Sequence, residues 1–417
     1  MVGVGRELTG SAAVGDVLDL TVGEAVQGGW CVARPDGEGG SGPALFVRHA
    51  LPGERVRAAV TQVTSRFARA DAVEIIRPAP ERVSAPCPYA RPGGCGGCDW
   101  QHASLPAQRE IKARIVSQQL RRIAGLERAV TVEPLPGAAD GLGWRTRVRF
   151  AVGGDGRAGL HRHRSHEIVP VSDCLIAHRL VSEAGVTRAT WPGARSVEVA
   201  VSPGTGQRAV LVSGRPAAGP RLLTQRAAGR DWRVAAAGFW QVHPGAADVL
   251  AGAVLAALRP EPGQTALDLF CGAGLFAGVL ADAVGPGGAV IAIERDAAAV
   301  RDARANLRSA PWARVHRGDA AQVLSRIGLS GASVAVLDPP RTGASRALIG
   351  PLCARQAPPG GPGLRAIAYV SCDPATLARD IAAFGRHGWR LDGLRAFDAF
   401  PMTHHVECLA ILVPPAG

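Results

Sequence analysis

The stretch Thr265-Ala266-Leu267-Asp268-Leu269-Phe270-Cys271-Gly272-Ala273-Gly274-Leu275-Phe276 decides the fold of the carboxyl-terminal half. An apolar run of strand length enters a glycine turn and continues into residues that favour a helix. Residues 289–293 form the next apolar run, which ends at the acidic Glu294. From Gly263 onward strand and helix patterns alternate. This alternation predicts a doubly wound parallel sheet, the Rossmann-like α/β class.

The glycine turn and the acids that follow it predict a cofactor site. Glycines let a ligand approach the backbone closely, and an acid at a strand end can accept hydrogen bonds from ribose hydroxyls. Glu294 has this position, and Asp319 follows the next strand pattern. The dinucleotide spacing G-x-G-x-x-G is matched only in part, and no other feature indicates hydride chemistry. We therefore expect S-adenosylmethionine rather than a dinucleotide; glycines with a purely structural role are the alternative.

The motif Ser371-Cys372-Asp373-Pro374 places a cysteine between a strand and a turn. The preceding residues 366–370 are apolar and read as a buried strand, and Asp373-Pro374 ends it. Cys372 is therefore expected at the carboxyl end of a strand, the edge where open α/β sheets bind ligands. A cysteine there is a candidate nucleophile or, without partners, a packing residue. The segments 338–341 and 400–407 can supply partners.

The amino-terminal part reads as a small barrel. Five short β-like runs separated by glycine turns lie between residues 16 and 78, which suits an antiparallel barrel of the oligonucleotide-binding (OB) kind. Residues 46–54 also resemble the middle of a TRAM domain, an RNA-binding barrel. The alternative is a small β-domain without an RNA ligand.

Four cysteines form a candidate metal site: Cys87, Cys95, Cys98 and, far downstream, Cys174. Thiolates two residues apart, as in Cys95-x2-Cys98, can bind one metal centre, and the other two complete a four-thiolate set. Glycines at 93, 94, 96 and 97 let the backbone fold tightly around it. Geometry alone admits zinc or a [4Fe–4S] cluster, and unrelated free thiols are the alternative.

Between these parts the sequence predicts a helix and a second β-rich region. Residues 103–124 carry an apolar stripe of Ile111, Ile115, Leu120 and Ile123. Residues 128–235 contain several short β-like runs. In 145–150 arginines alternate with apolar residues, so one face of that strand is expected to be basic. Such a face suits phosphate contacts, and a solvated sheet face is the alternative.

Composition favours a polyanionic partner. The formal net charge is +12 and Lys112 is the only lysine, so the basic residues are almost all arginines. Nucleic acid is the first expectation, although a composition bias of the whole genome is an alternative cause. No apolar run reaches the roughly 20 residues that cross a bilayer, and the start lacks a secretory pattern. We expect a cytoplasmic protein that does not enter membranes, and a monomer.

Five motifs in order carry a family resemblance: Phe239-Trp240-Gln241-Val242-His243-Pro244, Asp268-Leu269-Phe270-Cys271-Gly272-x-Gly274, Asp338-Pro339-Pro340-Arg341-x-Gly343, Tyr369-Val370-Ser371-Cys372-Asp373-Pro374-x-Thr376 and Pro401-Met402-Thr403-x-His405-Val406-Glu407. Together they resemble the RNA 5-methyluridine (uracil-C5) methyltransferases, from the barrel to the end of the chain. The resemblance implies that Cys372 is the nucleophile and Glu407 the base. It implies a cofactor and target-base site lined by Gln241, Phe270, Gly272, Glu294, Asp319 and Asp338.

The four cysteines match the iron–sulfur ligands of the ribosomal-RNA branch, so the resemblance implies a [4Fe–4S] cluster over zinc, and 23S rRNA over tRNA as substrate. Family members usually carry asparagine where this chain has His243 and Leu275. We expect three domains: a TRAM/OB-like barrel at 15–78, a central β-rich domain at 79–100 and 126–238, and a methyltransferase domain at 101–125 and 239–417.

Three other functions are compatible with parts of this pattern. A tRNA uracil methyltransferase uses the same site but lacks the cysteine set. A cytosine-C5 RNA methyltransferase also uses a cysteine, with a different motif order. A non-catalytic RNA-binding or RNA-folding factor would keep the architecture without the chemistry.

Overall fold

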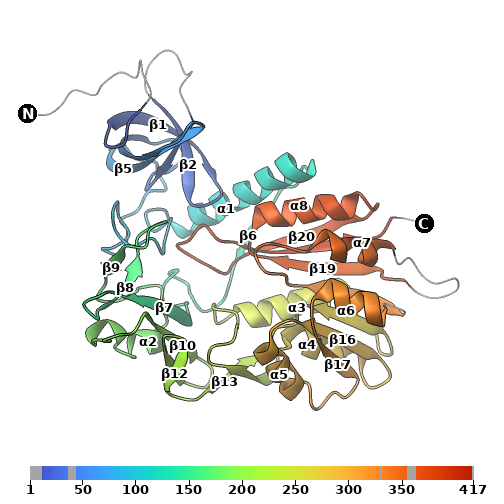
Figure 1. Cartoon of the computed structure of the whole chain (residues 1–417). Coiled ribbons are helices and arrows are strands. Elements are labelled where there is room, and N and C mark those ends of the chain that lie inside the picture. The colour runs from blue at the N-terminus through green and yellow to red at the C-terminus, as the bar shows by residue number, and fades with distance from the viewer. Residues whose placement is uncertain (1–11, 36–43, 329–330, 355–362, 416–417) are drawn as a thin grey trace, which may run out of the picture.

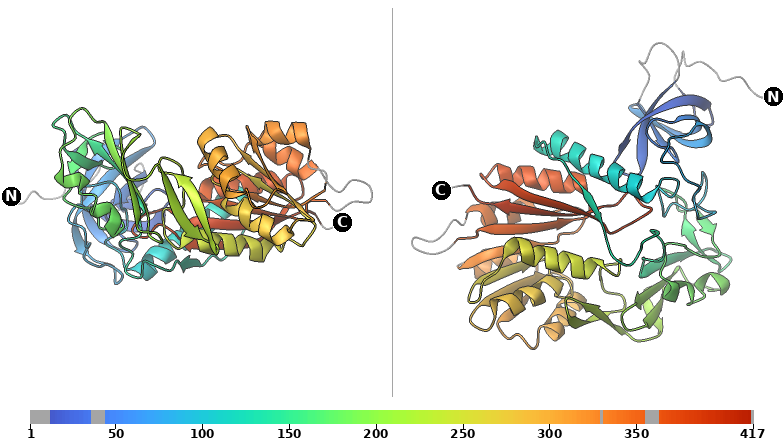
Figure 2. Two further views of the ribbon diagram at one scale, coloured as in Figure 1. Left: turned by 90° about the horizontal axis from the view of Figure 1, so that it is seen from below. Right: turned by 180° about the vertical axis from the view of Figure 1, so that it is seen from behind.

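The chain folds into three parts that meet at a common centre (Figure 1). The computed structural model describes residues 12–35, 44–328, 331–354 and 363–415. A barrel and a central β-rich part form one half of the molecule, and an α/β part forms the other. Figure 2 shows the same division from below and from behind.

The amino-terminal part is a closed barrel with strand order β1-β2-β3-β5-β4. Burial alternates along β1, as expected where one face of each strand points into a barrel. Apart from the parallel pair β3 and β5, neighbouring strands are antiparallel. The strands are β1 (Val17–Val26), β2 (Trp30–Pro35), β3 (Ala44–Arg48), β4 (Arg55–Val63) and β5 (Phe67–Arg77).

The central part is built from an antiparallel sheet with order β12-β11-β10-β7-β8-β9 and a separate hairpin, β13-β14. Its helices are short: α2 (Arg179–Ser182) and the 3₁₀ turn η2 (Val186–Arg188). The strands are β7 (Arg147–Val152), β8 (Ala158–His161), β9 (Ile168–Pro170), β10 (Ser196–Ser202), β11 (Gln207–Val212), β12 (Arg215–Ala218), β13 (Leu222–Ala227) and β14 (Arg230–Ala235).

The third part contains an eight-stranded sheet with order β17-β16-β15-β18-β19-β21-β20-β6. The central strands β18 and β19 are buried along their whole length, as expected for parallel strands covered on both faces. The strands are β6 (Val132–Pro134), β15 (Thr265–Leu269), β16 (Ala289–Glu294), β17 (Ala313–Arg317), β18 (Ala332–Leu337), β19 (Ala366–Ser371), β20 (Arg390–Asp398) and β21 (Glu407–Val413).

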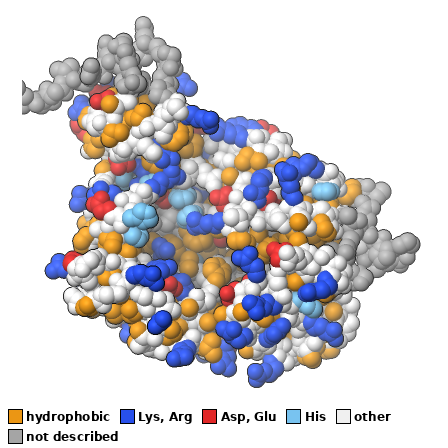
Figure 3. All heavy atoms as spheres, in the orientation of Figure 1, with side chains coloured by type: hydrophobic (Ala, Val, Ile, Leu, Met, Phe, Trp, Pro, Cys, Tyr) orange, Lys and Arg blue, Asp and Glu red, His pale blue; other side chains and the backbone are white. Residues whose placement is uncertain are grey.

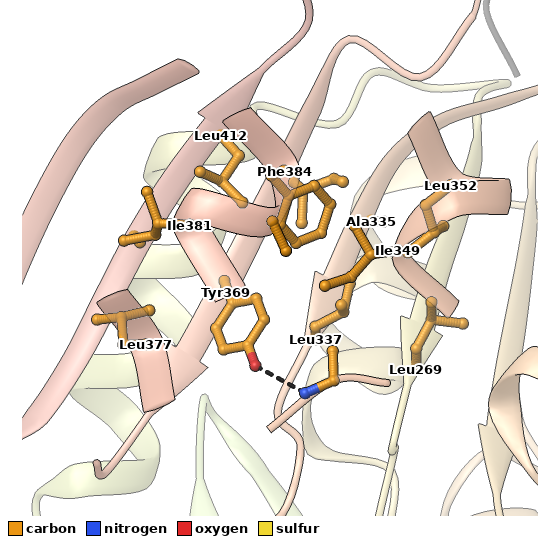
Figure 4. Packing of buried hydrophobic residues seen from close by; sticks show 14 of the residues in the cluster. Leu269, Ala335, Leu337, Ile349, Leu352, Tyr369, Leu377, Ile381, Phe384 and Leu412 are labelled. Atoms are coloured by element: carbon orange, nitrogen blue, oxygen red, sulfur yellow. Dashed lines mark hydrogen bonds between the residues drawn. The ribbon is translucent and has the colours of Figure 1, made fainter. Parts of the chain in front are cut away.

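Helices cover both faces of this sheet. One core cluster packs α3 (Ala246–Leu258), α4 (Leu275–Val284) and α5 (Ala297–Asn306) against one face. The other packs α6 (Ala320–Ile327), α7 (Arg346–Ala354) and α8 (Pro374–Gly385) against the opposite face. Figure 4 shows this second cluster, with Tyr369 between Leu337 and Leu377; its hydroxyl oxygen accepts a hydrogen bond from the Ala344 N–H (3.1 Å).

Helix α1 (Leu105–Gln119) joins the barrel to the α/β part. Ile111 and Ile115 belong to the barrel's core cluster, whereas Val116 and Leu120 belong to the core beside α8. The helix continues into a π-helical turn, Leu120–Ala124, and ends at Gly125, whose φ is 66°. Three residues of the predicted apolar stripe are thus divided between two cores, which fixes the barrel relative to the sheet. The fourth, Ile123, is exposed, because it lies in the π-helical turn beyond these contacts.

The predicted fold class, a Rossmann-like domain with an amino-terminal barrel and a central β-rich part, is confirmed. One strand lies elsewhere than expected. Residues 132–134, assigned by sequence to the central part, form β6 and pair in parallel with β20 at the edge of the large sheet. In the part of the chain that the structure describes, no helix combines the length and apolarity needed to cross a membrane.

Candidate active site

Cys372 and Glu407 lie side by side at the end of two neighbouring strands. Strands β19 and β21 are antiparallel, with Ser371 opposite Cys408. Cys372 follows Ser371, and Glu407 precedes Cys408, so the next opposed positions are the thiol and the carboxyl. This is the carboxyl end of the parallel strand β19, the edge predicted for the ligand.

The turn after Cys372 is fixed by a helix cap. Asp373 caps α8, because its Oδ1 accepts a hydrogen bond from the Thr376 N–H (2.8 Å). Pro374 occupies the first turn of that helix, where its missing N–H leaves no hydrogen bond unmade. The Asp-Pro pair therefore ends the strand and starts the helix in one step. This holds Cys372 at the junction.

Burial raises the pKa of the thiol and of the two acids beside it. The pKa of Cys372 is raised to about 11, chiefly by burial and next by the charge of Glu407, although the charge and a hydrogen bond of Arg341 act to lower it. Burial, followed by the nearby Asp338, raises the pKa of Glu407 well above its ordinary value. Burial alone raises the pKa of Asp338 to about 7. Arg341 is the cation that opposes these shifts at both Cys372 and Glu407.

The loop that carries Asp338 and Arg341 is anchored from beneath. The Ala344 N–H donates to both the Tyr369 hydroxyl oxygen and Asp380 Oδ2 (3.1 and 2.8 Å). At Gly343 the φ is 79°, and an added Cβ would lie 2.3 to 2.4 Å from α8 side chains. Only glycine fits such a turn. The loop is thereby pressed against the helix that follows Cys372.

The segment before Glu407 is held by residues around the cysteine motif. The N–H groups of Asp99 and Trp100 both donate to the Met402 carbonyl (2.9 and 3.0 Å). Asp99 Oδ2 accepts hydrogen bonds from the His404 N–H and ring Nδ1 (3.0 and 2.7 Å). Met402 has a φ of 67°, a conformation that a non-glycine residue keeps only when its surroundings impose it.

Helix α1 holds the same segment from the other side. Gln108 is fully buried, and its Oε1 accepts a hydrogen bond from the Met402 N–H (2.8 Å). Lys112, the chain's single lysine, pairs with Asp398 (2.6 Å) and donates to the Phe400 carbonyl (2.9 Å). Both Lys112 and Asp398 are buried. Removing one partner of such a pair leaves an uncompensated charge, so the pair pins the loop.

His405 connects this loop to Arg341. Burial, aided by the charges of His404 and Arg341, lowers the pKa of His405 to about 3, so its ring is neutral at physiological pH. A neutral ring can accept a hydrogen bond, and Arg341 Nη2 lies 3.2 Å from His405 Nε2. The ring also lies against His404, with centroids 4.0 Å apart. Arg341 is thus held between His405 and the Cys372 thiol.

Several of the predicted cofactor residues lie together where strands β15, β16 and β17 end. The Gly272 N–H donates to Glu294 Oε2 (3.0 Å), and the Phe270 N–H donates to the Ile293 carbonyl (2.9 Å). The Gly318 N–H donates to the Glu294 carbonyl (2.9 Å), which brings Asp319 to the same edge, where its Oδ1 caps α6. An added Cβ at Gly272 would meet no atom within 4 Å, so space is open there.

Asp268 is a residue that the sequence analysis did not assign to the site. It is fully buried; its Oδ2 accepts a hydrogen bond from the Ala277 N–H (2.7 Å), and its Oδ1 has no partner among the described residues. A buried oxygen without a partner fits a site that is completed by a ligand. A single acid inside an otherwise apolar strand was the available signal.

Two positions differ from the family's usual asparagine. Leu275 is buried in a cluster with Trp232 and Val279, so its side chain serves packing. His243 is buried, stacks on Trp144 at 6.0 Å, and its Nδ1 accepts a hydrogen bond from the Gly245 N–H (3.2 Å). His243 Nε2 has no partner in the described part of the chain. Gln241, in the same segment, is buried.

Phe239 was quoted in a motif but not predicted as a site residue. Its side chain is 67% exposed, and it lies two residues before Gln241. Arg147 holds the preceding turn by donating to the Ala236 and Gly238 carbonyls (2.7 and 2.6 Å). Arg147 also pairs with Glu198. The predicted basic face of β7 therefore serves, at Arg147, to support this turn.

The four cysteines predicted as a set line one cavity. Cys87, Cys95, Cys98 and Cys174 surround a space of about 230 Å³, together with Arg145 and residues 160–164. Burial raises the pKa of Cys98 and Cys174, and Cys95 adds to the shift of both. An added Cβ at Gly96 would lie 2.4 Å from the His163 backbone, so glycine is required for the close approach. Within the described ranges, no three or more His, Cys, Asp or Glu residues form a group that could hold a metal ion.

Figure 3, a space-filling view, shows that the molecule is hollowed where the three parts meet. Arginine and histidine side chains stand around the hollow, and apolar side chains line part of its floor. This basic hollow lies with the carboxyl ends of the parallel strands, where the predicted cofactor residues are. The two features define a class of protein: an S-adenosylmethionine-dependent methyltransferase fold joined to an RNA-binding type of barrel.

Comparisons with known proteins identify the family. Residues 12–73 match the TRAM domain, 260–328 a methyltransferase domain, and 328–414 the tRNA (Uracil-5-)-methyltransferase family. An uncharacterized RNA methyltransferase of Streptomyces coelicolor is 48% identical, over 97% of this chain and 94% of that protein. The 23S rRNA (uracil(1939)-C(5))-methyltransferase RlmD of Pseudomonas putida is 32% identical, over 89% of each. The chain belongs to the RNA uracil-5-methyltransferase family.

A solved structure has the same fold. The Pyrococcus abyssi tRNA (uracil-54, C5)-methyltransferase, in complex with S-adenosyl-L-homocysteine, superimposes with a TM-score of 0.72. The match covers 94% of this chain and 99% of that one, at 23% identity. The chain is thus an S-adenosylmethionine-dependent RNA (uracil-5-)-methyltransferase, as the motifs predicted.

Proposed function

We propose that this enzyme methylates carbon 5 of a uridine in 23S rRNA through a covalent bond between Cys372 and carbon 6. The observation that carries the proposal is the adjacency of Cys372, just after β19, and Glu407, at the start of β21, with Asp338 and Arg341 beside them. A nucleophile and a proton acceptor at one strand edge are the pair that this reaction needs.

Cys372 activates the ring. Carbon 5 of uracil is a poor nucleophile because the ring is conjugated. The thiolate adds to carbon 6, and the electron pair of the 5,6 double bond moves to give an enolate with nucleophilic carbon 5. Arg341 stabilises the thiolate, because its charge and hydrogen bond lower the pKa that burial raises. S-adenosylmethionine, when bound, supplies the methyl group as an electrophile.

Glu407 completes the turnover. After methylation, carbon 5 still carries its hydrogen, and the Glu407 carboxylate takes this proton. The electrons of the C–H bond restore the double bond, and the Cys372 thiolate is released. The raised pKa of Glu407 makes its carboxylate a stronger proton acceptor than an exposed glutamate.

Binding of the cofactor and target base is assigned to the residues at the same edge. We assign the cofactor and target-base site to Gln241, Phe270, Gly272, Glu294, Asp319 and Asp338; the partnerless Asp268 Oδ1 supports a ligand here. Glu294 and Asp319 are acceptors for hydroxyl groups. The exposed Phe239 ring offers a stacking surface for a base turned out of the RNA.

The cysteine cavity is proposed to hold a [4Fe–4S] cluster. Four cysteines line this cavity, which is the number of ligands that such a cluster needs, and the family resemblance favours the cluster over zinc. Anaerobic reconstitution with iron and sulfide should give a broad visible absorbance and about four iron atoms per chain. Zinc incorporation without sulfide uptake would overturn this assignment.

The substrate is tested with RNA transcripts. Purified enzyme and labelled S-adenosylmethionine are incubated with a 23S rRNA transcript spanning uridine 1939, the position named for the Pseudomonas relative, and with tRNA transcripts. We expect 5-methyluridine in the 23S transcript. A matched transcript with cytidine at that position is the control. Methylation of the tRNA alone would contradict the proposed substrate and favour the tRNA branch.

A further inference from the structure

One side chain of the barrel is surrounded by arginines from two parts of the chain. Trp30, on β2, has the guanidinium carbons of Arg48, Arg69 and Arg164 within 5.9, 5.3 and 5.8 Å of its ring centroid. Arg69 belongs to barrel strand β5, whereas Arg164 belongs to the loop between β8 and β9 of the central part. The tryptophan is buried, so the arginines form the surface over it.

Two of these guanidinium groups lack an acidic partner. Arg48 pairs with Asp99 (3.3 Å), and in the neighbouring loop Arg162 pairs with Glu167 (2.8 Å). Among the described residues no ion pair forms at Arg69 or Arg164; Arg69 donates a hydrogen bond to the neutral Gln62 instead. Asp71, another acid of β5, is acted on by the charges of Arg48 and Arg162.

Arg69 and Arg164 are close enough to repel each other. Burial, and next the charge of Arg164, lowers the pKa of Arg69. Arg164 is held in a left-handed conformation, with φ of 51°, which a non-glycine residue adopts at a cost. Two like charges brought together in this way are stabilised by an anion between them, and guanidinium groups bind phosphate oxygens with matching geometry.

The arginines are related in space to residues 399–406, the loop that precedes Glu407. His163 packs edge-on against Trp30, with centroids 5.4 Å apart, and the charges of Arg164 and His404 both act on His163. His404 lies three residues before Glu407. Arg164 and the segment before Glu407 therefore both lie near His163.

We propose that Arg69 and Arg164 form a binding site for one phosphate group of the RNA backbone, shared by the barrel and the central part. This inference rests on the proposed RNA substrate and adds the residues that hold it. Trp30 serves as the platform on which both guanidinium groups are oriented.

The test is the salt dependence of RNA binding. Dissociation constants for the 23S transcript are measured between 50 and 300 mM KCl, for wild type and for the double variant Arg69→Gln/Arg164→Gln. Loss of one phosphate contact lowers the log–log slope by about 0.7–0.9. Because both arginines are proposed to share one phosphate, either single substitution should weaken binding more than the other substitution does when it is added to it. Arg326→Gln, an exposed arginine at the end of α6, is the matched control and should keep the wild-type slope.

Other results overturn the inference. An unchanged slope would show that neither arginine meets a phosphate, and a loss of about 1.4–1.8 would mean two separate contacts. The double variant Arg69→Lys/Arg164→Lys keeps both positive charges, so it should keep the wild-type slope. A reduced slope in this variant would exclude a charge effect. Inorganic phosphate that stabilises only the wild type against heat, with no slope difference for RNA, would indicate a free-phosphate site. Failure of the wild type to methylate 23S rRNA is a different result and would affect the proposed substrate alone.

Discussion

Gln27 of the barrel donates a hydrogen bond from Nε2 to Oδ2 of Asp373 (2.7 Å), although the two residues are 346 positions apart. Asp373 follows the candidate nucleophile Cys372 and caps α8. The same turn of the barrel packs on Asp99, because an added Cβ at Gly29 would lie 2.6 Å from that side chain. The barrel therefore touches both the turn that follows Cys372 and the segment that holds the loop before Glu407.

This contact predicts a role for the barrel in turnover as well as in RNA binding. Gln27→Ala removes one hydrogen bond to the cap, which is worth about 1 kcal/mol. We expect kcat to fall about fivefold while the dissociation constant for RNA stays within about twofold of wild type. Gln322→Ala, which removes an exposed glutamine on α6, should change neither. An unchanged kcat in Gln27→Ala would mean that the contact has no catalytic importance.

His405 is predicted to position Arg341. His405→Phe removes the acceptor for the guanidinium, so Arg341 no longer stays against Cys372. We expect alkylation of Cys372 by iodoacetamide, followed by peptide mass spectrometry, to slow about tenfold at pH 8. His405→Gln, which keeps an acceptor, should recover part of the rate. The exposed His387→Phe is the control, and equal rates in all three variants would contradict this role.

Glu407→Gln should separate bond formation from release. The amide cannot take the proton from carbon 5, so the adduct forms and is not resolved. With unmodified RNA we expect a protein–RNA complex that survives denaturing electrophoresis, and turnover reduced at least about a thousandfold. Glu133→Gln, at a half-buried glutamate of β6, should behave as wild type apart from loss of its ion pair with Arg395. Normal turnover in Glu407→Gln would exclude it as the base.

The reactivity of the thiol should depend on pH. Because burial and Glu407 raise the pKa of Cys372 to about 11, and Arg341 and Asp338 are the other charged groups that act on it, the thiol is protonated in the free enzyme at neutral pH. Alkylation of Cys372 should rise about tenfold per pH unit from pH 7 to 9. Arg341→Gln should raise the pKa and lower the rate at each pH, whereas Glu407→Gln should lower the pKa and raise it. A plateau below pH 9 would contradict this electrostatic picture.

The sequence predicts much of this architecture because local patterns report which residues are buried. The strand, glycine turn and helix at 265–276 occur as expected, and Cys372 lies at the carboxyl end of β19. Periodicity does not report what a buried face packs against. Ile111 and Ile115 pack into the barrel rather than the methyltransferase core, so removing residues 1–80 would expose them. Point variants are therefore the sharper test of the barrel.

Features that depend on contacts between distant residues could not be predicted from the sequence. The three-residue strand β6 is too short to give a β pattern, and its partner β20 lies more than 250 positions away. The chain of contacts from Asp99 through His404 and His405 to Arg341 joins three segments. No spacing rule predicts it, because each residue alone reads as an ordinary polar position.

The most direct measurement of the central claim uses RNA in which the target uridine is replaced by 5-fluorouridine. The base removes a proton from carbon 5, and a fluorine atom in that position cannot leave in the same way. The wild-type enzyme should therefore form a stable complex with the RNA. Peptide mass spectrometry should locate the attachment at Cys372. Cys372→Ser should form no complex and no 5-methyluridine. Methylation by Cys372→Ser at the wild-type rate, or attachment at another cysteine, would contradict the account.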